Sequence, residues 1–192
     1  MADDEGFDKL VQSARKAGAA LRDAGIPYAV GGGLAAWVRG GPETEHDADL
    51  LVKPEDAERA LDALGDAGFR PERPLEDWLL KAYDGDVLVD LIFSPASGPV
   101  DDELLARAET LEVLALPMPV ATLEDVMVTK LLALTEQEPD LGSCLEIARS
   151  LREQIDWQEV RERTADAPFA AAFFTLIEEL GVVEARGAGG GG

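Results

Sequence analysis

The 192-residue sequence is poor in cysteine and in long apolar runs. Its single cysteine, Cys144, excludes a disulfide framework, and so few cysteines are typical of proteins kept in a reducing compartment. The segment MADDEGFDKL at the start of the chain is acidic and lacks the apolar core of a signal peptide. The apolar runs are too short to cross a bilayer. We therefore expect a cytoplasmic protein with no membrane partner.

Basic residues are also scarce, with 17 lysines and arginines against 39 acidic residues and a formal net charge of −22. No run of basic residues interrupts this pattern, which argues against general binding of nucleic acids. An acidic surface repels polyanions and attracts cations. With 46% apolar residues the chain can nevertheless bury a core, so we expect it to fold.

Hydrophobic periodicity divides the chain into a mixed region and a helical region. The mixed region contains amphipathic helical patterns at residues 7–21 and from Pro54 onward. It also contains short apolar strand patterns, and the pair Asp84-Gly85 between two of them indicates a hairpin. The expected strands are residues 28–30, 48–52, 79–83, 87–93, 111–114 and 118–120.

From Thr122 onward the period is helical, and Thr122 followed by Asp125 forms a capping-box pattern. We therefore predict an α+β fold. A small mixed or antiparallel sheet with flanking helices is followed by a C-terminal helical bundle. The predicted regions are a core over residues 1–120, a helical region over 121–183 and a disordered glycine-rich tail over 184–192.

An alternating pair of aspartates begins the second expected strand. Residues two apart in a strand point to the same face, so Asp47 and Asp49 project together. Two adjacent carboxylates repel each other, and a divalent cation relieves that repulsion. Hard cations such as Mg²⁺ prefer oxygen ligands of this kind. A third carboxylate, Asp90, lies within the apolar strand VLVDLIF, where a charge is unfavourable unless it faces a site or an ion.

A glycine turn precedes this pair of aspartates. Gly31, Gly32 and Gly33 follow the first strand and lead into a helical stretch. Such a turn allows backbone N–H groups and a helix N-terminus to approach a phosphate. The order of glycine turn, Asp-x-Asp strand and later strand aspartate therefore predicts a site for a metal and a triphosphate.

This arrangement resembles the nucleotidyltransferase superfamily, which has a polymerase-beta-like fold. It is similar in particular to the AbiEii-type nucleotidyltransferase toxins, including small mycobacterial toxins that modify tRNA ends. The likeness covers roughly residues 26–155. The matching residues are Gly32, Gly33, Ala35, Gly40, Thr44, Asp47, Asp49, Leu50, Asp90 and Lys130. The sequence departs from the pattern at Glu43 and His46, where basic residues are common, and in the segment EQEPDLGS, which lacks a Lys-Asp pair.

The resemblance implies a nucleoside triphosphate substrate, two Mg²⁺ (or Mn²⁺) ions and release of pyrophosphate. It implies that Asp47, Asp49 and Asp90 are catalytic and bind the metal, and that Asp90 orients or deprotonates the attacking hydroxyl. The nucleotide-binding residues it implies are Gly32, Gly33, Thr44 and Lys130.

Four side chains have more than one interpretation. Lys130 is a phosphate contact or a lysine that extends from an amphipathic helix to solvent. Lys81 is a phosphate contact or a salt-bridge partner within the hairpin. Arg39 is a surface charge or a phosphate contact. His46 precedes Asp47 and is expected to point to the opposite face as a packing or surface residue.

Three functions are compatible with these residues. The first is a toxin of a toxin–antitoxin system that modifies tRNA and has a cognate antitoxin. The second is modification of a cationic small molecule such as an aminoglycoside-like antibiotic, which the net charge favours. The third is an idle nucleotide-binding protein, which the intact aspartates argue against. A tRNA acceptor requires a local basic strip, for which we expect Arg39, Lys53, Lys81, Lys130, Arg149 and Arg152.

Overall fold

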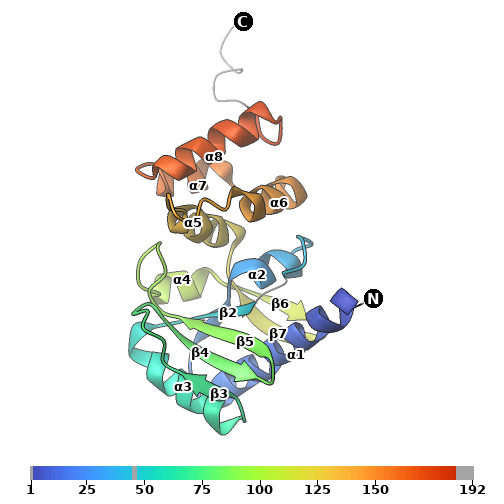
Figure 1. The fold of residues 1–192 in the computed structure, drawn as a ribbon, viewed down its shortest axis with the longest axis vertical. Coiled ribbons are helices and arrows are strands. Elements are labelled where there is room, and N and C mark those ends of the chain that lie inside the picture. The colour runs from blue at the N-terminus through green and yellow to red at the C-terminus, as the bar shows by residue number, and fades with distance from the viewer. Residues whose placement is uncertain (1, 45–46, 185–192) are drawn as a thin grey trace, which may run out of the picture.

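The structure is a computed structural model that describes residues 2–44 and 47–184 (Figure 1). Within those residues the chain forms a mixed seven-stranded sheet with helices around it, which confirms the α+β class. The strands are β1 (Tyr28–Val30), β2 (Asp47–Val52), β3 (Arg70–Glu72), β4 (Leu79–Asp84), β5 (Val87–Ile92), β6 (Glu109–Val113) and β7 (Leu116–Val120).

The strands follow the spatial order β3-β4-β5-β2-β1-β7-β6. Strand β2 runs parallel to β5, and β1 runs parallel to β7, whereas the other neighbours are antiparallel. The expected hairpin joins β4 and β5. Asp84 pairs with Val87, and Gly85 in the turn between them has a φ of +63°, a conformation that glycine adopts easily.

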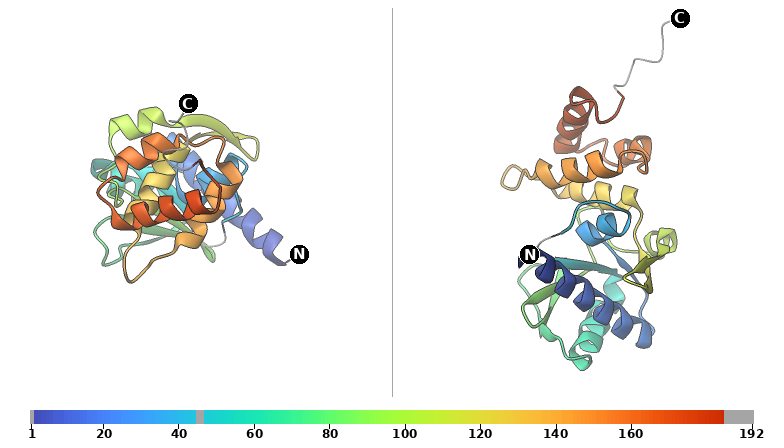
Figure 2. Two further views of the ribbon diagram at one scale, coloured as in Figure 1. Left: turned by 90° about the horizontal axis from the view of Figure 1, so that it is seen from above. Right: turned by 90° about the vertical axis from the view of Figure 1, so that its right-hand side faces the viewer.

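One face of the sheet is covered by α1 (Ala2–Asp23) and α3 (Ala57–Asp66), which pack against each other and against the central strands (Figures 1 and 2). Helix α1 buries one stripe at helical spacing, as its periodicity predicts. The buried residues in this stripe are Phe7, Leu10, Val11, Ala14, Ala17 and Leu21. A single 3-10 turn, η1 (Pro54–Asp56), introduces α3.

The remaining helices lie on the other side of the sheet from α3 (Figure 1). They are α2 (Gly32–Val38), α4 (Asp102–Arg107), α5 (Leu123–Ala133), α6 (Leu141–Leu151), α7 (Trp157–Arg163) and α8 (Pro168–Glu179). Helices α2 and α4 lie next to the sheet, and α6, α7 and α8 lie farther from it (Figure 1). Helix α5 packs on α2 and connects the sheet to α6, α7 and α8. The expected caps form, because the side chain of Thr122 accepts from the Asp125 N–H and that of Asp140 accepts from the Gly142 N–H.

Two elements were not expected from the sequence. Strand β3 has three residues with Pro71 at its centre, and α4 has six residues capped by Asp101. Both are too short to show a hydrophobic period. The expectations for His46 and for residues 185–192 lie outside the described residues. Among the helices that are described, none combines the length and the apolar character needed to cross a membrane.

Candidate active site

The three aspartates meet on neighbouring strands in the middle of the sheet. The parallel pairing of β2 with β5 places Asp49 directly beside Asp90. Asp47 lies two residues before Asp49 and therefore projects from the same face, whereas Ala48 and Leu50 point the other way and are fully buried. One carboxylate oxygen from each aspartate lies within 4.8 Å of the others. The juxtaposition expected from strand alternation is thus present.

The glycine turn lies against this cluster. Gly32 has a φ of +52°, and a Cβ built on it would lie 1.6 Å from Oδ2 of Asp49. A Cβ on Gly33 would lie 2.8 Å from both Cβ and Oγ1 of Thr44. Only glycine leaves room for the two side chains that face the turn. Helix α2 follows the turn and has seven residues, and Gly31 at its start provides no side-chain cap. The close contacts at Gly32 and Gly33 therefore give these two glycines a steric role.

The electrostatics of the cluster are unfavourable without a cation. Burial, followed by the neighbouring charges of Asp47 and Asp90, raises the pKa of Asp49 to about 7, although Lys130 opposes this shift. Burial and the charge of Asp47 raise the pKa of Asp90 to about 6, against the influence of Lys81. Oδ1 of Asp90 is buried and has no hydrogen-bond partner among the described residues.

This donor set fits a hard divalent cation. It consists of carboxylate oxygens alone, and such oxygens are the ligands that Mg²⁺ and Mn²⁺ prefer. A buried oxygen without a partner is costly, and a metal ion would satisfy it. The three aspartates are therefore the residues that could hold the metal.

Two cavities adjoin the cluster, and Asp47, Asp49 and Lys130 line both. The larger cavity has a volume of about 740 Å³ and is also lined by Asp90 and Trp78. The smaller has a volume of about 360 Å³, and its further lining residues are Gly33, Pro42, Glu43, Thr44, Asp140, Ser143, Glu146 and Ile147. Of the expected nucleotide-binding residues, Gly32 lines the larger cavity, Gly33 and Thr44 line the smaller, and Lys130 lines both.

Comparison with known sequences decides the family. The family described as "uncharacterised nucleotidyltransferase" matches residues 8–178, which is most of the chain. The chain belongs to this nucleotidyltransferase family. No curated protein matches its sequence.

Solved structures share the fold of this nucleotidyltransferase at low identity. The solution structure of the antibiotic-resistance factor ANT(2'')-Ia matches with a TM-score of 0.65 and 20% identity, covering 91% of this chain and 98% of that one. A crystal structure of the same factor in complex with adenylyl-2''-tobramycin matches with a TM-score of 0.62 and 20% identity over 85% and 98% of the two chains. A candidate nucleotidyltransferase from Thermotoga maritima matches with a TM-score of 0.55 and 19% identity over 76% and 92%.

The structure places two basic side chains whose roles the sequence left open. Lys81 lies opposite Asp90 in the hairpin and limits the rise in the pKa of Asp90, but among the described residues it forms no ion pair, and it lines neither cavity beside the cluster. Arg39 lies elsewhere. Its Nη1 donates to Oε2 of Glu109 at 2.7 Å, and its Nη2 donates to the carbonyl oxygen of Ala121 at 3.0 Å. Arg39 therefore connects the end of α2 to the β6–β7 hairpin.

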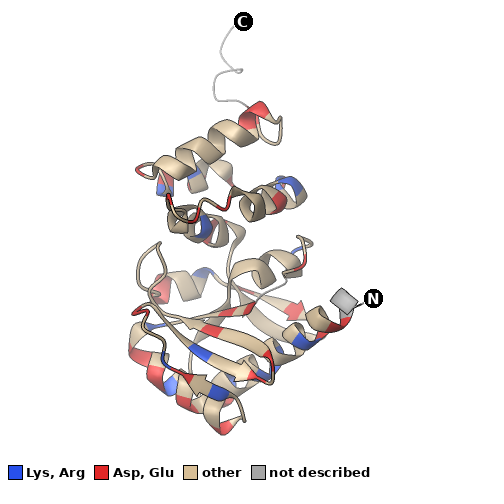
Figure 3. Cartoon of the chain, viewed as in Figure 1, with Lys and Arg blue, Asp and Glu red and all other residues tan. Residues whose placement is uncertain are grey.

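The basic strip that we expected around the cluster does not form. Of the six residues proposed for it, Lys130 alone lines the two cavities. Lys53 forms ion pairs with Glu55 and Asp102, and Arg152 with Glu153. Lysines and arginines are instead scattered over the fold (Figure 3). A strip was expected only for a tRNA acceptor, and strand and helix patterns do not show which surface charges meet in space.

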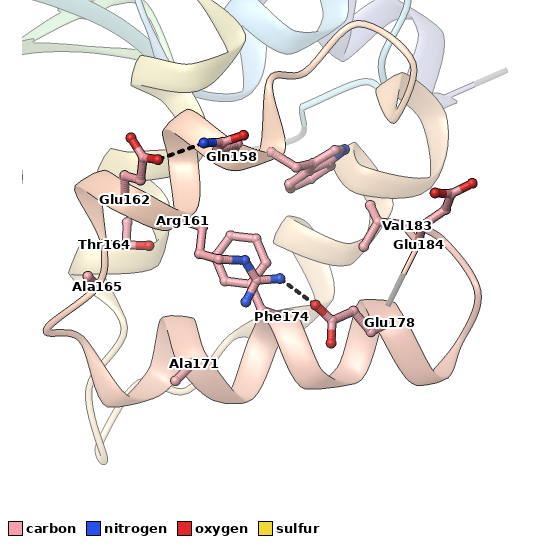
Figure 4. Close-up of a pocket in the computed structure, with 11 residues that line it drawn as sticks. Gln158, Arg161, Glu162, Thr164, Ala165, Ala171, Phe174, Glu178, Val183 and Glu184 are labelled. Atoms are coloured by element: carbon pink, nitrogen blue, oxygen red, sulfur yellow. Dashed lines mark hydrogen bonds and ion pairs between the residues drawn. The ribbon is translucent and has the colours of Figure 1, made fainter. Parts of the chain in front are cut away.

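A third cavity, of about 630 Å³, lies between α7 and α8, far from the carboxylate cluster (Figure 4). The guanidinium of Arg161 lies over the ring of Phe174, 4.0 Å from its centroid, and forms an ion pair with Glu178. None of the expected site residues lines this cavity. The two cavities beside the cluster are therefore the candidate site.

Several residues that line the larger cavity were not expected from the sequence. They include Asp77, Trp78, Ser94, Thr129 and Glu138. The three tryptophans are scattered along the sequence, which hides the fact that Trp78 lies near the aspartates. Its position directly after two acidic residues, in the segment EDW before β4, is the one signal that could have indicated a cation-binding edge.

Proposed function

We propose that this nucleotidyltransferase transfers a nucleoside monophosphate from a nucleoside triphosphate to a hydroxyl group of a cationic small molecule. The observation that carries the proposal is the carboxylate cluster. One oxygen from each of the three aspartates lies within 4.8 Å of the others, Oδ1 of Asp90 is buried and has no hydrogen-bond partner among the described residues, and two cavities adjoin the cluster. Such an arrangement suits metal-assisted transfer of a phosphoryl group.

The aspartates hold the metal in this proposal. Asp47 and Asp49 bind Mg²⁺ or Mn²⁺, and Asp90 shares in that coordination. When bound, the metal neutralises charge on the triphosphate and makes the acceptor hydroxyl easier to deprotonate. Lys130, which lies next to the same carboxylates, contributes a positive charge for the phosphates.

Asp90 takes up the proton of the acceptor hydroxyl. The acceptor oxygen attacks the α-phosphorus, and the bond from that phosphorus to the pyrophosphate oxygen breaks, with its electron pair leaving on pyrophosphate. In this proposal one carboxylate oxygen of Asp90 contacts the metal, and the other accepts the proton.

A cationic acceptor agrees with the charges on this chain. The net charge is −22, and no basic strip lies beside the cluster to hold a polyanion. The ANT(2'')-Ia factor, whose fold this chain shares, was solved with adenylyl-2''-tobramycin. An aminoglycoside-like compound, with several ammonium and hydroxyl groups, has the chemistry required of the acceptor.

The proposal is tested by measuring pyrophosphate release. The purified protein is incubated with Mg²⁺, each of the four nucleoside triphosphates, and tobramycin or related aminoglycosides. We expect release that depends on both the metal and the acceptor, and that is lost in Asp49→Asn. Asp86→Asn is the matched control, because it removes one charge from the exposed hairpin turn. Release that ignores the aminoglycoside would contradict a cationic acceptor.

A tRNA acceptor is the second candidate, supported by the similarity of the motif from Gly32 to Leu50 to tRNA-modifying toxins. The same protein is incubated with labelled triphosphates and total RNA. Labelling of a tRNA-sized band that is lost in Asp49→Asn would favour the toxin over the small-molecule enzyme. A cognate antitoxin would then be the expected protein partner.

A further inference from the structure

The two cavities beside the cluster differ in the side chains that reach them. Asp47, Asp49 and Lys130 line both, but Asp90 lines the larger cavity and not the smaller. Thr44 lines the smaller cavity and not the larger. The two cavities therefore share Asp47, Asp49 and Lys130, and the proposed proton acceptor lines the larger of them.

In-line transfer requires the acceptor and the leaving group to lie in different directions from the reacting phosphorus. The attacking oxygen and the leaving pyrophosphate lie on opposite sides of the α-phosphorus. The acceptor hydroxyl must approach Asp90. This residue is 7% exposed and lines the larger cavity, and its Oδ1 is buried without a hydrogen-bond partner among the described residues. The acceptor then enters through the larger cavity, and the pyrophosphate leaves on the side of Thr44.

The larger cavity has an aromatic edge that is held in place. Trp78 is 39% exposed, which is unusual for so large an apolar side chain. Its carbonyl oxygen accepts hydrogen bonds from the N–H groups of Phe93 and Ser94, both at 3.1 Å, so its backbone is fixed beside the end of β5. Thr129 also lines this cavity, and its Oγ1 forms a hydrogen bond of 2.9 Å with Oγ of Ser97 that connects the loop after β5 to α5.

Acidic side chains accompany this tryptophan. Asp77 and Glu138 line the larger cavity, and among the described residues neither forms an ion pair. The smaller cavity also contains carboxylates, so charge alone does not separate the two. The combination of an exposed indole, an adjacent carboxylate and Asp90 occurs in the larger cavity. An indole face and a carboxylate together attract an ammonium group.

We propose that the larger cavity is the acceptor site and that Trp78 and Asp77 bind an ammonium group of the acceptor, so that its hydroxyl reaches Asp90. This assignment rests on the proposed function and adds to it the residues that select the acceptor. Trp78 and Asp77 are binding residues, and the nucleotide makes no contact with them.

The experiment measures two affinities for each variant of the full chain. Calorimetry gives the Kd for tobramycin, and separately the Kd for the best-bound nucleoside triphosphate with Mg²⁺. The variants are Trp78→Ala, Trp78→Phe and Asp77→Asn. Leu75→Ala is the control for Trp78, because Leu75 is fully exposed on the same loop and does not line the cavity. Asp86→Asn is the control for loss of one charge.

Trp78→Ala and Asp77→Asn are each expected to weaken tobramycin binding about tenfold. Trp78→Phe should retain most of the affinity because it keeps an aromatic face. Triphosphate binding should stay within about twofold in all variants, and both controls should match the wild type.

Three results would overturn the assignment. If Trp78→Ala weakens triphosphate binding instead, the indole stacks on the nucleotide base, and the cavity assignment fails while the proposed function stands. If tobramycin affinity is unchanged in both Trp78→Ala and Asp77→Asn, the acceptor binds elsewhere. If the wild type binds triphosphate but neither binds tobramycin nor releases pyrophosphate in its presence, the proposed acceptor class fails, and the assignment fails with it.

Discussion

Two buried carboxylate centres in this nucleotidyltransferase differ in their hydrogen-bond partners. Asp90 in the sheet is 7% exposed, and Asp125 at the start of α5 is 3% exposed. Asp125 accepts from Arg107 Nη2 at 2.9 Å and from Arg163 Nη2 at 2.6 Å. Thr122 Oγ1 also donates to it at 3.0 Å. Asp90 keeps an unpartnered oxygen.

The difference in partners reverses the pKa shift. Burial alone would raise the pKa of Asp125, but the hydrogen bonds from Arg107 and Arg163 outweigh burial and hold that pKa below its usual value. In the cluster, burial and like charges act together and raise the pKa of Asp49 and Asp90. Asp125 thus connects α4, α5 and α7 and has a structural role. In the cluster, by contrast, the carboxylates repel one another, and a bound cation can relieve that repulsion.

The largest expected difference between the centres is in activity. Asp49→Asn removes a metal ligand and should lower the rate of pyrophosphate release by about 10³-fold or more. The same change should leave the metal-free protein folded and as stable as the wild type or more so, because it removes a repelling charge. Release assays and denaturant unfolding check both parts. A large loss of stability would mean that Asp49 is structural.

The converse change should affect stability instead. Asp125→Ala leaves two arginines without their shared partner and should lower the free energy of unfolding by about 2–4 kcal/mol. That range allows for the fact that Arg107 and Arg163 are partly exposed and can be hydrated. Urea unfolding of the metal-free protein measures the effect. An unchanged midpoint would show that the three charges do not hold α4, α5 and α7 together.

The glycine turn offers a matched pair of substitutions. Gly32→Ala introduces strain at a φ of +52° and places a methyl group 1.6 Å from Oδ2 of Asp49, so we expect a loss of about 3 kcal/mol and a displaced Asp49. Gly85 has a φ of +63° with no atom within 4 Å of a built Cβ. Gly85→Ala should therefore cost only about 1 kcal/mol and leave activity intact. Equal effects at the two glycines would remove the argument from close approach.

The two centres should also respond to pH in opposite directions. The folded-state pKa values of Asp49 and Asp90, about 7 and 6, lie above the usual value near 3.9 in an unfolded chain. Their contribution to stability is therefore complete below about pH 4 and is lost as the pH rises toward 7. Asp125, with its lowered pKa, contributes above about pH 4 and loses its contribution in more acidic solution.

Unfolding of the chelator-treated protein between about pH 5 and 8 should show stability falling by about 2 kcal/mol as the pH rises. Asp49→Asn should flatten much of this slope, and Asp86→Asn should retain it. The control matters because a net charge of −22 also disfavours the folded state at higher pH. A slope that is identical in both variants would show that the cluster does not carry the effect.

Much of the cluster could be predicted because it follows from local rules. Strand alternation places Asp47 and Asp49 on one face, and the two-residue turn after Asp84 sets the register that brings Lys81 opposite Asp90. The pairing of β2 with β5, however, joins segments some 40 residues apart, and no local pattern encodes it. Asp90 could be assigned to the same site as Asp47 and Asp49 because a charge within an apolar strand is unfavourable unless it faces a site or an ion.

The acceptor side of the site could not be predicted in the same way. Trp78 and Asp77 precede β4, Ser94 follows β5, and Glu138 follows α5, so they meet only through the folded topology. The positions of the basic side chains could not be predicted for the same reason. Arg39, for example, is directed to Glu109 rather than to the cluster. The domain boundary near residue 120 and the roles of Gly32, Gly33, Thr44 and Lys130 in nucleotide binding stay predictions.

The central claim is that the cluster of Asp47, Asp49 and Asp90 binds a triphosphate only through a divalent metal. Calorimetric titration of each nucleoside triphosphate into the full chain, with Mg²⁺ and then with excess chelator, tests it directly. The account predicts measurable binding of at least one triphosphate with Mg²⁺. In chelator, binding should be weaker by about two orders of magnitude or more, because the ionised aspartates then repel the phosphates. Equal affinity under both conditions would contradict the account.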